Sequence, residues 1–171
     1  MTVKQMEGLA EGMRRGMRRV AQGVTVISLV DGDGQRLAMT ASSVTSVSAE
    51  PPSMLVCVHR DASAHLSLSE SRPFCINVLD QEMEGISNLC AGQARGEERF
   101  AEGQWLVDPT SRVPYLERAL VNFFCIPDAI LDYGTHLICV GKLDAVIVHP
   151  EERLPLLYHN GRYGTFKPRV P

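Results

Sequence analysis

The stretch from Leu37 to Val58 constrains the fold more than any other part of the chain. It consists of two segments rich in Val, Ser and Thr, separated by Ala49-Glu50-Pro51-Pro52. β-Branched residues favour strands, and prolines cannot donate hydrogen bonds to a neighbouring strand. We therefore predict two strands whose pairing stops, or reaches a sheet edge, at the proline pair.

The same stretch is dense in hydroxyl side chains, at Thr40, Ser42, Ser43, Thr45, Ser46, Ser48 and Ser53. A half-buried strand normally has an apolar residue at every second position. Small side chains beside short donors suit the close approach of a flat ligand with polar edges. The alternative is a Ser-rich edge strand whose hydroxyls bond the nearby backbone.

Elsewhere, short apolar segments alternate with turn residues. Met6, Leu9, Met13, Met17 and Val20 recur at helical spacing and predict an N-terminal helix over residues 1–22, ended by Gly23. Strands are predicted over 24–30, 36–41, 54–58, 74–79, 119–131, 136–148, 156–158 and 162–166, with a hairpin turn at 31–34. Short helices are predicted over 63–71, with Ser63 as N-cap, and over 82–90, whereas 91–108 is predicted to be irregular.

Strands separated mostly by turns favour a closed antiparallel barrel over a parallel doubly wound sheet. No GxGxxG sequence follows a predicted strand, which also disfavours a dinucleotide-binding fold of that kind. A length of 171 residues fits one domain. We predict a single domain over 1–171, with the helix over 1–22 and the barrel over 23–166.

Charge and hydropathy exclude several classes of function. The net charge of −3 creates no field that favours nucleic acid or an anionic membrane. Arg14, Arg15, Arg18 and Arg19 form a basic run that we interpret as a solvated helix face. No window approaches the roughly 20 apolar residues of a membrane span. The apolar run Val24–Val30 ends in a turn, unlike an export signal. We expect a cytoplasmic protein without nucleic-acid or membrane partners.

The cysteines and histidines do not indicate a metal site. The chain has five cysteines without CxxC spacing, and its five histidines show no HExxH pattern. Four of the cysteines lie in apolar runs, where a free thiol packs as a small hydrophobe. We interpret them as reduced core residues and not as a disulfide framework or zinc site.

Five ordered segments resemble the short flavin reductases that serve two-component monooxygenases: Gly23–Leu29, Ala38–Val58, Phe74–Leu79, Gly134–Val146 and Leu156–Phe166. The resemblance extends from about Met13 to Phe166. It implies a mainly β fold, a split β-barrel of the FMN-binding type with a few peripheral helices, usually as a homodimer. It also implies reduction of FMN or FAD by NADH or NADPH, and delivery of reduced flavin to a partner oxygenase.

The resemblance places the flavin ring against Ala38, Thr40, Ala41, Ser42 and Ser43. It places the flavin phosphate and the polar rim of the ring in the turn that contains Val58, His59, Arg60, Ser63 and Ala64. Main-chain N–H groups at a helix start, with Ser63 and Arg60, suit a phosphate. The family commonly has Asn at the position of His59, and Ser or Thr at those of Asp61, Ala62 and Ala64. The alternative for this turn is a capped surface helix.

Asn88–Gly92 resembles the family's Phe-Ala-Gly turn, with Cys90 in the Phe position. This similarity implies that Ala91, Gly92 and the later Arg99 contact the ribityl-phosphate tail of the flavin, whereas a lone Arg in a charged loop is otherwise solvated. Tyr163 resembles a family position that lines the same pocket as His136, where nicotinamide stacks on the flavin.

Gly134-Thr135-His136 resembles the family's Gly-Asp-His motif, with Thr in place of Asp. The resemblance implies that His136 lies over the flavin where nicotinamide stacks, as the one catalytic residue. A histidine there can donate to a carboxamide or place positive charge near a developing anion. The alternative is a structural histidine at a strand end, and the Thr removes a carboxylate that would orient the ring.

Two other functions remain open on the sequence. The first is a non-catalytic flavin-binding protein of the same barrel, since a fold does not fix a function. The second is a pyridoxal-phosphate oxidase on a similar barrel, which needs several basic residues around the phosphate, where this chain offers Arg60 and Arg99. A flavin reductase needs no catalytic acid, base or nucleophile from the protein, because the cofactors carry the redox chemistry.

Overall fold

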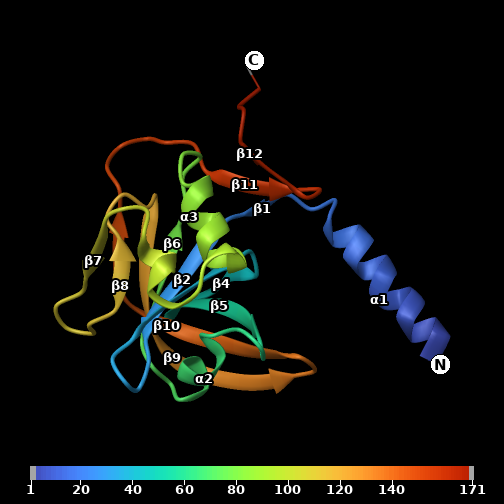
Figure 1. Ribbon diagram of the computed structural model, residues 1–171, viewed down its shortest axis with the longest axis horizontal. Coiled ribbons are helices and arrows are strands. Elements are labelled where there is room, and N and C mark those ends of the chain that lie inside the picture. Colours follow the sequence, from blue (N-terminus) through green and yellow to red (C-terminus); the bar gives the residue numbers. More distant parts are fainter. Residues whose placement is uncertain (1–2, 170–171) are drawn as a thin grey trace.

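A curved antiparallel sheet of seven strands forms the body of the protein (Figure 1). The computed structural model describes residues 3–169, with side chains from Gly8 onward. The strand order is β3-β2-β6-β9-β10-β5-β4. The bounds are β2 Thr25–Val30, β3 Arg36–Ala41, β4 Val44–Ala49, β5 Pro52–His59, β6 Phe74–Val78, β9 Val121–Tyr133 and β10 His136–Val148.

The two edge strands of the curved sheet, β3 and β4, are consecutive in the sequence. β3 ends at Ala41 and β4 begins at Val44, so that Ser42 and Ser43 alone connect them. This connection spans about 11 Å at most. No ladder joins β3 to β4 within residues 3–169. The mainly β split barrel implied by the resemblance is therefore confirmed. The closed barrel that the strand pattern alone favoured is not found, because β3 and β4 are not paired.

Two smaller sheets and several short helices surround the barrel. β1 Gln22–Gly23, β11 Leu156–His159 and β12 Arg162–Thr165 form one sheet, and β7 Trp105–Val107 pairs with β8 Pro114–Leu116. The helices are α1 Val3–Met17, α2 His65–Ser69 and α3 Glu84–Asn88, with a π-helical turn η1 Leu89–Gln93 and a 3₁₀ turn η2 Gly96–Phe100. Within residues 3–169, no helix is long and apolar enough to cross a membrane.

The N-terminal helix is shorter than predicted. It ends at Met17 and not at residue 22, because the chain then enters β1, where Gly23 pairs with Leu157 of β11. The predicted helix end at Gly23 is therefore wrong. α1 extends away from the barrel (Figure 1), and its side chains at Leu9 and Met13 are exposed. The side chain of Met6, the first residue of the predicted apolar stripe, lies outside the described part.

Two further local predictions are corrected by tertiary contacts. Ser63 does not cap α2, which follows Ala64 without a side-chain cap; instead, the Ser63 hydroxyl accepts a hydrogen bond from Arg99. The segment 91–108 is also more ordered than predicted, because it contains η2 and β7. β7 forms a hairpin with β8, a pairing that the sequence pattern did not indicate.

A buried polar network holds the β7–β8 hairpin on the barrel. Asn77 of β6 is fully buried, and its Oδ1 accepts from the Leu116 N–H at 2.8 Å and from Asn122 Nδ2 at 2.9 Å. Its Nδ2 donates to Val26 O and to Ser28 Oγ, each at 2.9 Å. Buried polar groups are costly unless bonded, and here each group of Asn77 has partners.

The apolar core leaves little room for added atoms. Ile27, Leu29, Val56 and Phe74 are fully buried. At Gly141 of β10, an added Cβ would lie 2.8 Å from Cys125 Cβ and 2.9 Å from Phe74 Cζ. Four of the five cysteines are buried and the fifth, Cys57, is half-buried, with all five as free thiols. The cysteines at 75, 90, 125 and 139 are core residues, as predicted.

Candidate functional site

A cavity of about 480 Å³ opens beside the split in the barrel. We call it the β3 cavity, and it is lined by Val24, Thr40, Ser42, Asn88, Ala91, Tyr158, Gly161 and Tyr163. Ligand pockets in proteins commonly have volumes of roughly 300–1,000 Å³. Four residues predicted from the resemblance, Thr40, Ser42, Ala91 and Tyr163, meet here from β3, its connection to β4, η1 and β12.

The edge of β3 offers main-chain groups to this cavity. β3 pairs with β2 on one side and has no strand on the other. The Ala38 carbonyl points away from β2 and accepts from Arg99 Nη1 at 2.6 Å. In a regular strand, polar main-chain groups two residues apart point the same way. The N–H and C=O of Thr40 are therefore directed toward the free edge, where a ligand with polar rims can bind.

Two of the predicted hydroxyl donors are already used by the fold. Thr40 Oγ1 donates to Ser87 O at 2.6 Å, and Ser43 Oγ donates to Cys57 O at 2.8 Å. Both hydroxyls thus donate to backbone carbonyls, as in the alternative prediction, but these partners are 47 and 14 residues away in the sequence. Ser42 is exposed, and within residues 3–169 its hydroxyl has no hydrogen-bond partner. The expectation of a ring held by the Thr40 and Ser43 hydroxyls is revised: Ser42 and the β3 main chain are the free polar groups.

Sequence reasoning missed a pair that shapes the cavity wall. Ser87 of α3 is fully buried, and its Oγ lies 2.8 Å from the Tyr163 hydroxyl of β12. The Tyr163 ring also packs edge-on against Tyr158, with ring centroids 5.1 Å apart. These contacts fasten α3 to the β11–β12 hairpin. The helical pattern of residues 82–90 marks its apolar face but does not identify Ser87, because the partner is distant in sequence.

Arg99 connects three parts of the candidate site. Its Nη1 donates to Ala38 O of β3 and, at 2.8 Å, to Ser63 Oγ before α2, and its Nε donates to Ala94 O at 3.1 Å. The side chain is half-buried, so it is not the solvated loop arginine of the alternative prediction. The structure thus brings Arg99, Ser63 and Ala38 together beside the β3 cavity.

Near Arg99, the predicted turn at Ala91 and Gly92 adopts a sharp bend. Gly92 has a φ of 118°, a backbone conformation that glycine adopts without steric strain and that is strained for other residues. Burial raises the pKa of the neighbouring Cys90 thiol to about 12, an effect that Arg99 partly offsets. Cys90 is therefore a neutral apolar group and not a thiolate nucleophile.

His136 and His59 form a separate cluster at the ends of β10 and β5. The two residues are direct partners in the sheet, and their rings pack edge-on at 5.0 Å between centroids. The Thr135 hydroxyl lies 3.0 Å from His136 Nδ1, so a hydroxyl contacts the ring at the position where the family motif has Asp. A carboxylate is still present, since Asp61 Oδ2 lies 3.6 Å from His59 Nδ1. Neither histidine lines the β3 cavity.

The predicted phosphate seat is only partly assembled. Val58 and Ala64 are fully buried, and Arg60 donates to the Gly134 carbonyl in the β9–β10 turn. Arg60 makes no bond to Ser63, which is bonded to Arg99 instead. Ala41 is buried with the hydrophobic core. Of the two predicted basic residues, Arg99 is the one that bonds Ser63 of this turn.

Together, these features define a split β-barrel with a cavity for a flat, polar-edged ligand at its open edge. Residues 3–169 contain no group of three or more His, Cys, Asp or Glu that could hold a metal ion. The chain belongs to the flavin reductase like domain family, to which residues 17–167 match.

Individual relatives match nearly the whole chain. The reductase component of an FADH₂-dependent resorcinol hydroxylase from Rhizobium sp. (strain MTP-10005) is 37% identical over 163 residues, which are 95% of this chain and 90% of that protein. The FMN reductase (NADH) RutF of Enterobacter cloacae is 36% identical over 155 residues, 91% of this chain and 93% of that protein. The crystal structure of BorF, the flavin reductase component of a bacterial two-component tryptophan halogenase, superposes with a TM-score of 0.83 at 35% identity, covering 94% of this chain and 99% of BorF.

Proposed function

We propose that the chain is a single-domain NAD(P)H-dependent flavin reductase that reduces FMN or FAD and supplies the reduced flavin to a partner oxygenase. The observation that carries this proposal is the β3 cavity, because its free strand edge, Ser42 and Tyr163 suit a flat ring with polar rims. The relatives named above are reductase components or NADH-dependent FMN reductases.

In this proposal the protein binds, orients and releases, while the hydride transfer belongs to the flavin and the nicotinamide. The β3 edge and Ser42 bind the ring, Ala91 and Gly92 border its tail, and Arg99 faces the phosphate. Arg99 keeps its position through its bonds to Ala38 and Ser63. His136 positions the nicotinamide at the end of β10, with its ring held by Thr135 and packed on His59.

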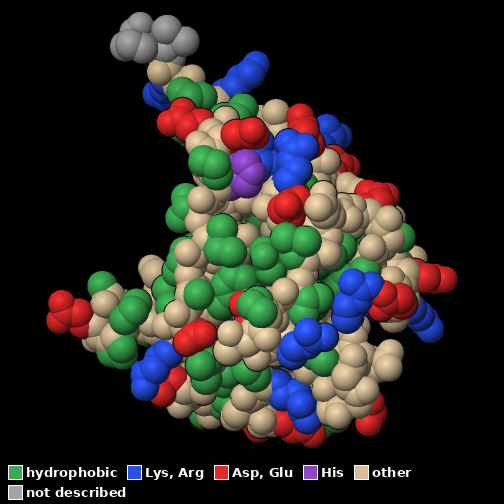
Figure 2. All heavy atoms as spheres, turned by 90° about the vertical axis from the view of Figure 1, so that its left-hand side faces the viewer, with side chains coloured by type: hydrophobic (Ala, Val, Ile, Leu, Met, Phe, Trp, Pro, Cys, Tyr) green, Lys and Arg blue, Asp and Glu red, His purple; other side chains and the backbone are tan. Residues whose placement is uncertain are grey.

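We also propose a homodimer, on the basis of exposed apolar surface. The end of β10 presents Val146, Ile147 and Val148, with Val148 68% exposed. The face toward the β7–β8 hairpin shows hydrophobic side chains gathered near its middle and bordered by charged residues (Figure 2). Large exposed apolar patches indicate interfaces. We place the protein in the cytoplasm, since its five free thiols suit a reducing compartment.

The decisive test is oxidation of NADH or NADPH, followed by its near-ultraviolet absorbance, with and without FMN, FAD or riboflavin. We expect oxidation only when a flavin is present. Flavin binding without oxidation would identify the non-catalytic flavin-binding alternative. Absence of both binding and oxidation would refute the proposal.

A further inference from the structure

One buried side chain supports a wall of the β3 cavity from behind. Ser87 of α3 is fully buried and is not among the residues that line the cavity. Its hydroxyl lies 2.8 Å from the hydroxyl of Tyr163, a residue of β12 that does line the cavity. Any influence of the Ser87 side chain on a ligand in the cavity therefore passes through Tyr163.

Strand β12 contacts the body of the protein mainly through Tyr163. Within residues 3–169, β12 is the outer strand of its small sheet and pairs with β11 alone. Of its four residues, Tyr163 is half-buried and the other three are exposed. Tyr163 packs against the core cluster that contains Leu79 and Ile86. In the same part of the chain, its bond to Ser87 is the one side-chain hydrogen bond between β12 and α3.

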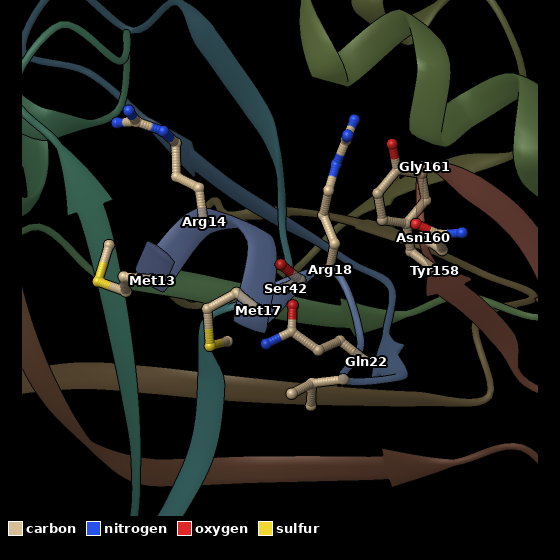
Figure 3. Close-up of a pocket in the computed structure, with 10 residues that line it drawn as sticks. Met13, Arg14, Met17, Arg18, Gln22, Ser42, Tyr158, Asn160 and Gly161 are labelled. Carbon is tan, nitrogen blue, oxygen red and sulfur yellow. The ribbon is translucent and has the colours of Figure 1, made fainter. Parts of the chain in front are cut away.

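The β11–β12 hairpin lies between two hollows. A second hollow, of about 350 Å³, separates it from the end of α1, and Tyr158 and Gly161 line both this hollow and the β3 cavity. In Figure 3, Tyr158 and Gly161 stand on the hairpin side of the second hollow, and Met13 and Met17 stand on the helix side. A side chain beside open space has fewer packing partners than a core residue. The hydrogen bond of Tyr163 is therefore important for fixing the position of its ring.

The backbone of Ser87 is held independently of its hydroxyl. Its carbonyl accepts from Thr40 Oγ1 at 2.6 Å, and its N–H donates to Met83 O at 3.1 Å. Replacement of Ser87 with Ala removes the hydroxyl and leaves both of these bonds. The Tyr163 hydroxyl then lacks its buried partner, and such a group is more stable when the ring turns to expose it to water.

We propose that Ser87 is a positioning residue that holds the Tyr163 ring against the flavin ring in the β3 cavity. The inference rests on the proposed function, because that function places a flavin ring in this cavity. A wall that is in place before the ligand arrives does not have to be ordered on binding, and this preorganisation raises affinity. Ser87 thereby stabilises the flavin complex although it contacts only the protein.

Flavin titrations of wild type, Ser87→Ala, Tyr163→Phe and the double variant test the proposal. Flavin fluorescence measures the Kd of riboflavin and of FMN in each protein. In Ser87→Ala, we expect both Kd values to rise about threefold to tenfold, and by the same factor, because both ligands carry the same ring. Tyr163→Phe keeps the aromatic ring and removes the hydroxyl that bonds Ser87. The addition of Ser87→Ala to Tyr163→Phe should therefore change the Kd no further.

Two more variants separate positioning from a loss of stability. The matched control is Ser28→Ala, the same change at another fully buried serine, whose hydroxyl bonds Pro114 O and Asn77 Nδ2 beside the β7–β8 hairpin. It should lower the Tm without changing the Kd of flavin. Ser87→Cys keeps a weak donor of similar size, so its Kd should lie between those of wild type and Ser87→Ala. It also replaces Ser87→Ala in the titrations if that variant does not fold.

Fluorine NMR follows the Tyr163 ring without any ligand. The chain has four tyrosines, and in protein labelled with fluorotyrosine the signal that is missing from Tyr163→Phe belongs to Tyr163. We expect this signal to shift in Ser87→Ala and to keep its position in Ser28→Ala. A Tyr163 signal that is the same in Ser87→Ala as in wild type overturns the proposal.

The titrations overturn the proposal if Ser87→Ala binds flavin as tightly as wild type, if Ser28→Ala weakens binding by the same factor, or if the effects of Ser87→Ala and Tyr163→Phe on the Kd are additive. Flavin-dependent NADH oxidation by wild type is assayed separately. Absence of both flavin binding and oxidation in wild type refutes the proposed function. Flavin binding in wild type that Ser87→Ala leaves intact refutes this inference alone.

Discussion

Replacing Asn77 with Leu tests whether the buried polar network holds the β7–β8 hairpin on the barrel. Leu has the same number of side-chain heavy atoms and the same branching at Cγ, so the change removes hydrogen bonds without opening a cavity. Asn122 Nδ2 retains a second bond, to Leu116 O at 3.1 Å, and Ser28 retains its bond to Pro114 O. The Leu116 N–H loses the acceptor at Asn77, in a residue only 1% exposed.

The magnitude follows from this inventory. A buried N–H without an acceptor costs about 1–3 kcal/mol, and each lesser bond lost adds about 0.5–1.5 kcal/mol. We expect Asn77→Leu to lower the free energy of unfolding by about 2–4 kcal/mol. For a domain of this size, the corresponding loss of Tm is about 5–15 °C. Ser28→Ala, which leaves the Leu116 bond in place, should cost about 1–2 kcal/mol and provides a graded control.

The assay uses Trp105, the only tryptophan, which lies in β7 and packs on the Phe100 ring with centroids 4.7 Å apart. In Asn77→Leu, we expect its emission to shift to longer wavelength at a lower temperature than the loss of the far-ultraviolet circular dichroism of the barrel. The hairpin then opens before the barrel melts. A Tm within about 2 °C of wild type, with both signals changing together, would refute the role assigned to the network.

Four further perturbations test the core and the site. Gly141→Ala places a Cβ less than 3 Å from core atoms and should lower the free energy of unfolding by about 1–3 kcal/mol in denaturant titrations. Gly23→Ala is the control, because an added Cβ meets nothing within 4 Å there and stability should not change. Thr40→Val removes the bond to α3 and should lower stability by about 1 kcal/mol while changing the Kd of flavin little; a large loss of flavin affinity at unchanged stability contradicts the revised role of this hydroxyl. His136→Ala should raise the KM for NADH more than the Kd of flavin, measured at saturating flavin, and equal effects on both argue for a cofactor contact. Burial raises the pKa values of the core thiols, to about 12 for Cys125. The thiols of the unfolded chain therefore deprotonate first, and the free energy of unfolding should fall as the pH rises above their ordinary pKa of 9.0. Urea midpoints that stay constant from pH 8 to pH 10 would contradict this.

Much of the fold could be predicted because its strands are marked locally. The run over 136–148 is β10 without a change of bounds, and the turn at 31–34 joins β2 to β3 as predicted. β-Branched residues and turn residues act within a few positions, so the sequence displays them directly. The β7–β8 hairpin was missed because it is bonded to the barrel through Asn77, which lies far away in the chain. The end of α1 was misplaced for the same reason, since pairing of β1 with β11 decides it.

The candidate site, too, could be predicted only in part. Motif resemblance indicated which segments come together, and Thr40, Ser42, Ala91 and Tyr163 do line one cavity. It could not indicate which polar atoms remain free, because each hydroxyl or guanidinium bonds the nearest suitable group in three dimensions. Arg60 bonds the Gly134 carbonyl, and Arg99 bonds Ser63, although both were predicted from the same kind of evidence.

The position of the cavity follows from how the barrel is built. A closed barrel pairs every strand edge, whereas this one stops between β3 and β4, although only two serines separate them in the sequence. The free edge of β3 would otherwise leave main-chain groups without partners, a cost that proteins rarely accept. Arg99 satisfies one of these groups, the Ala38 carbonyl, and the next group along the strand faces the cavity. In the proposed function, a ligand with a polar rim completes the pairing that the sheet lacks. Ligand binding and the split in the barrel would then both follow from the same interruption in the strand order.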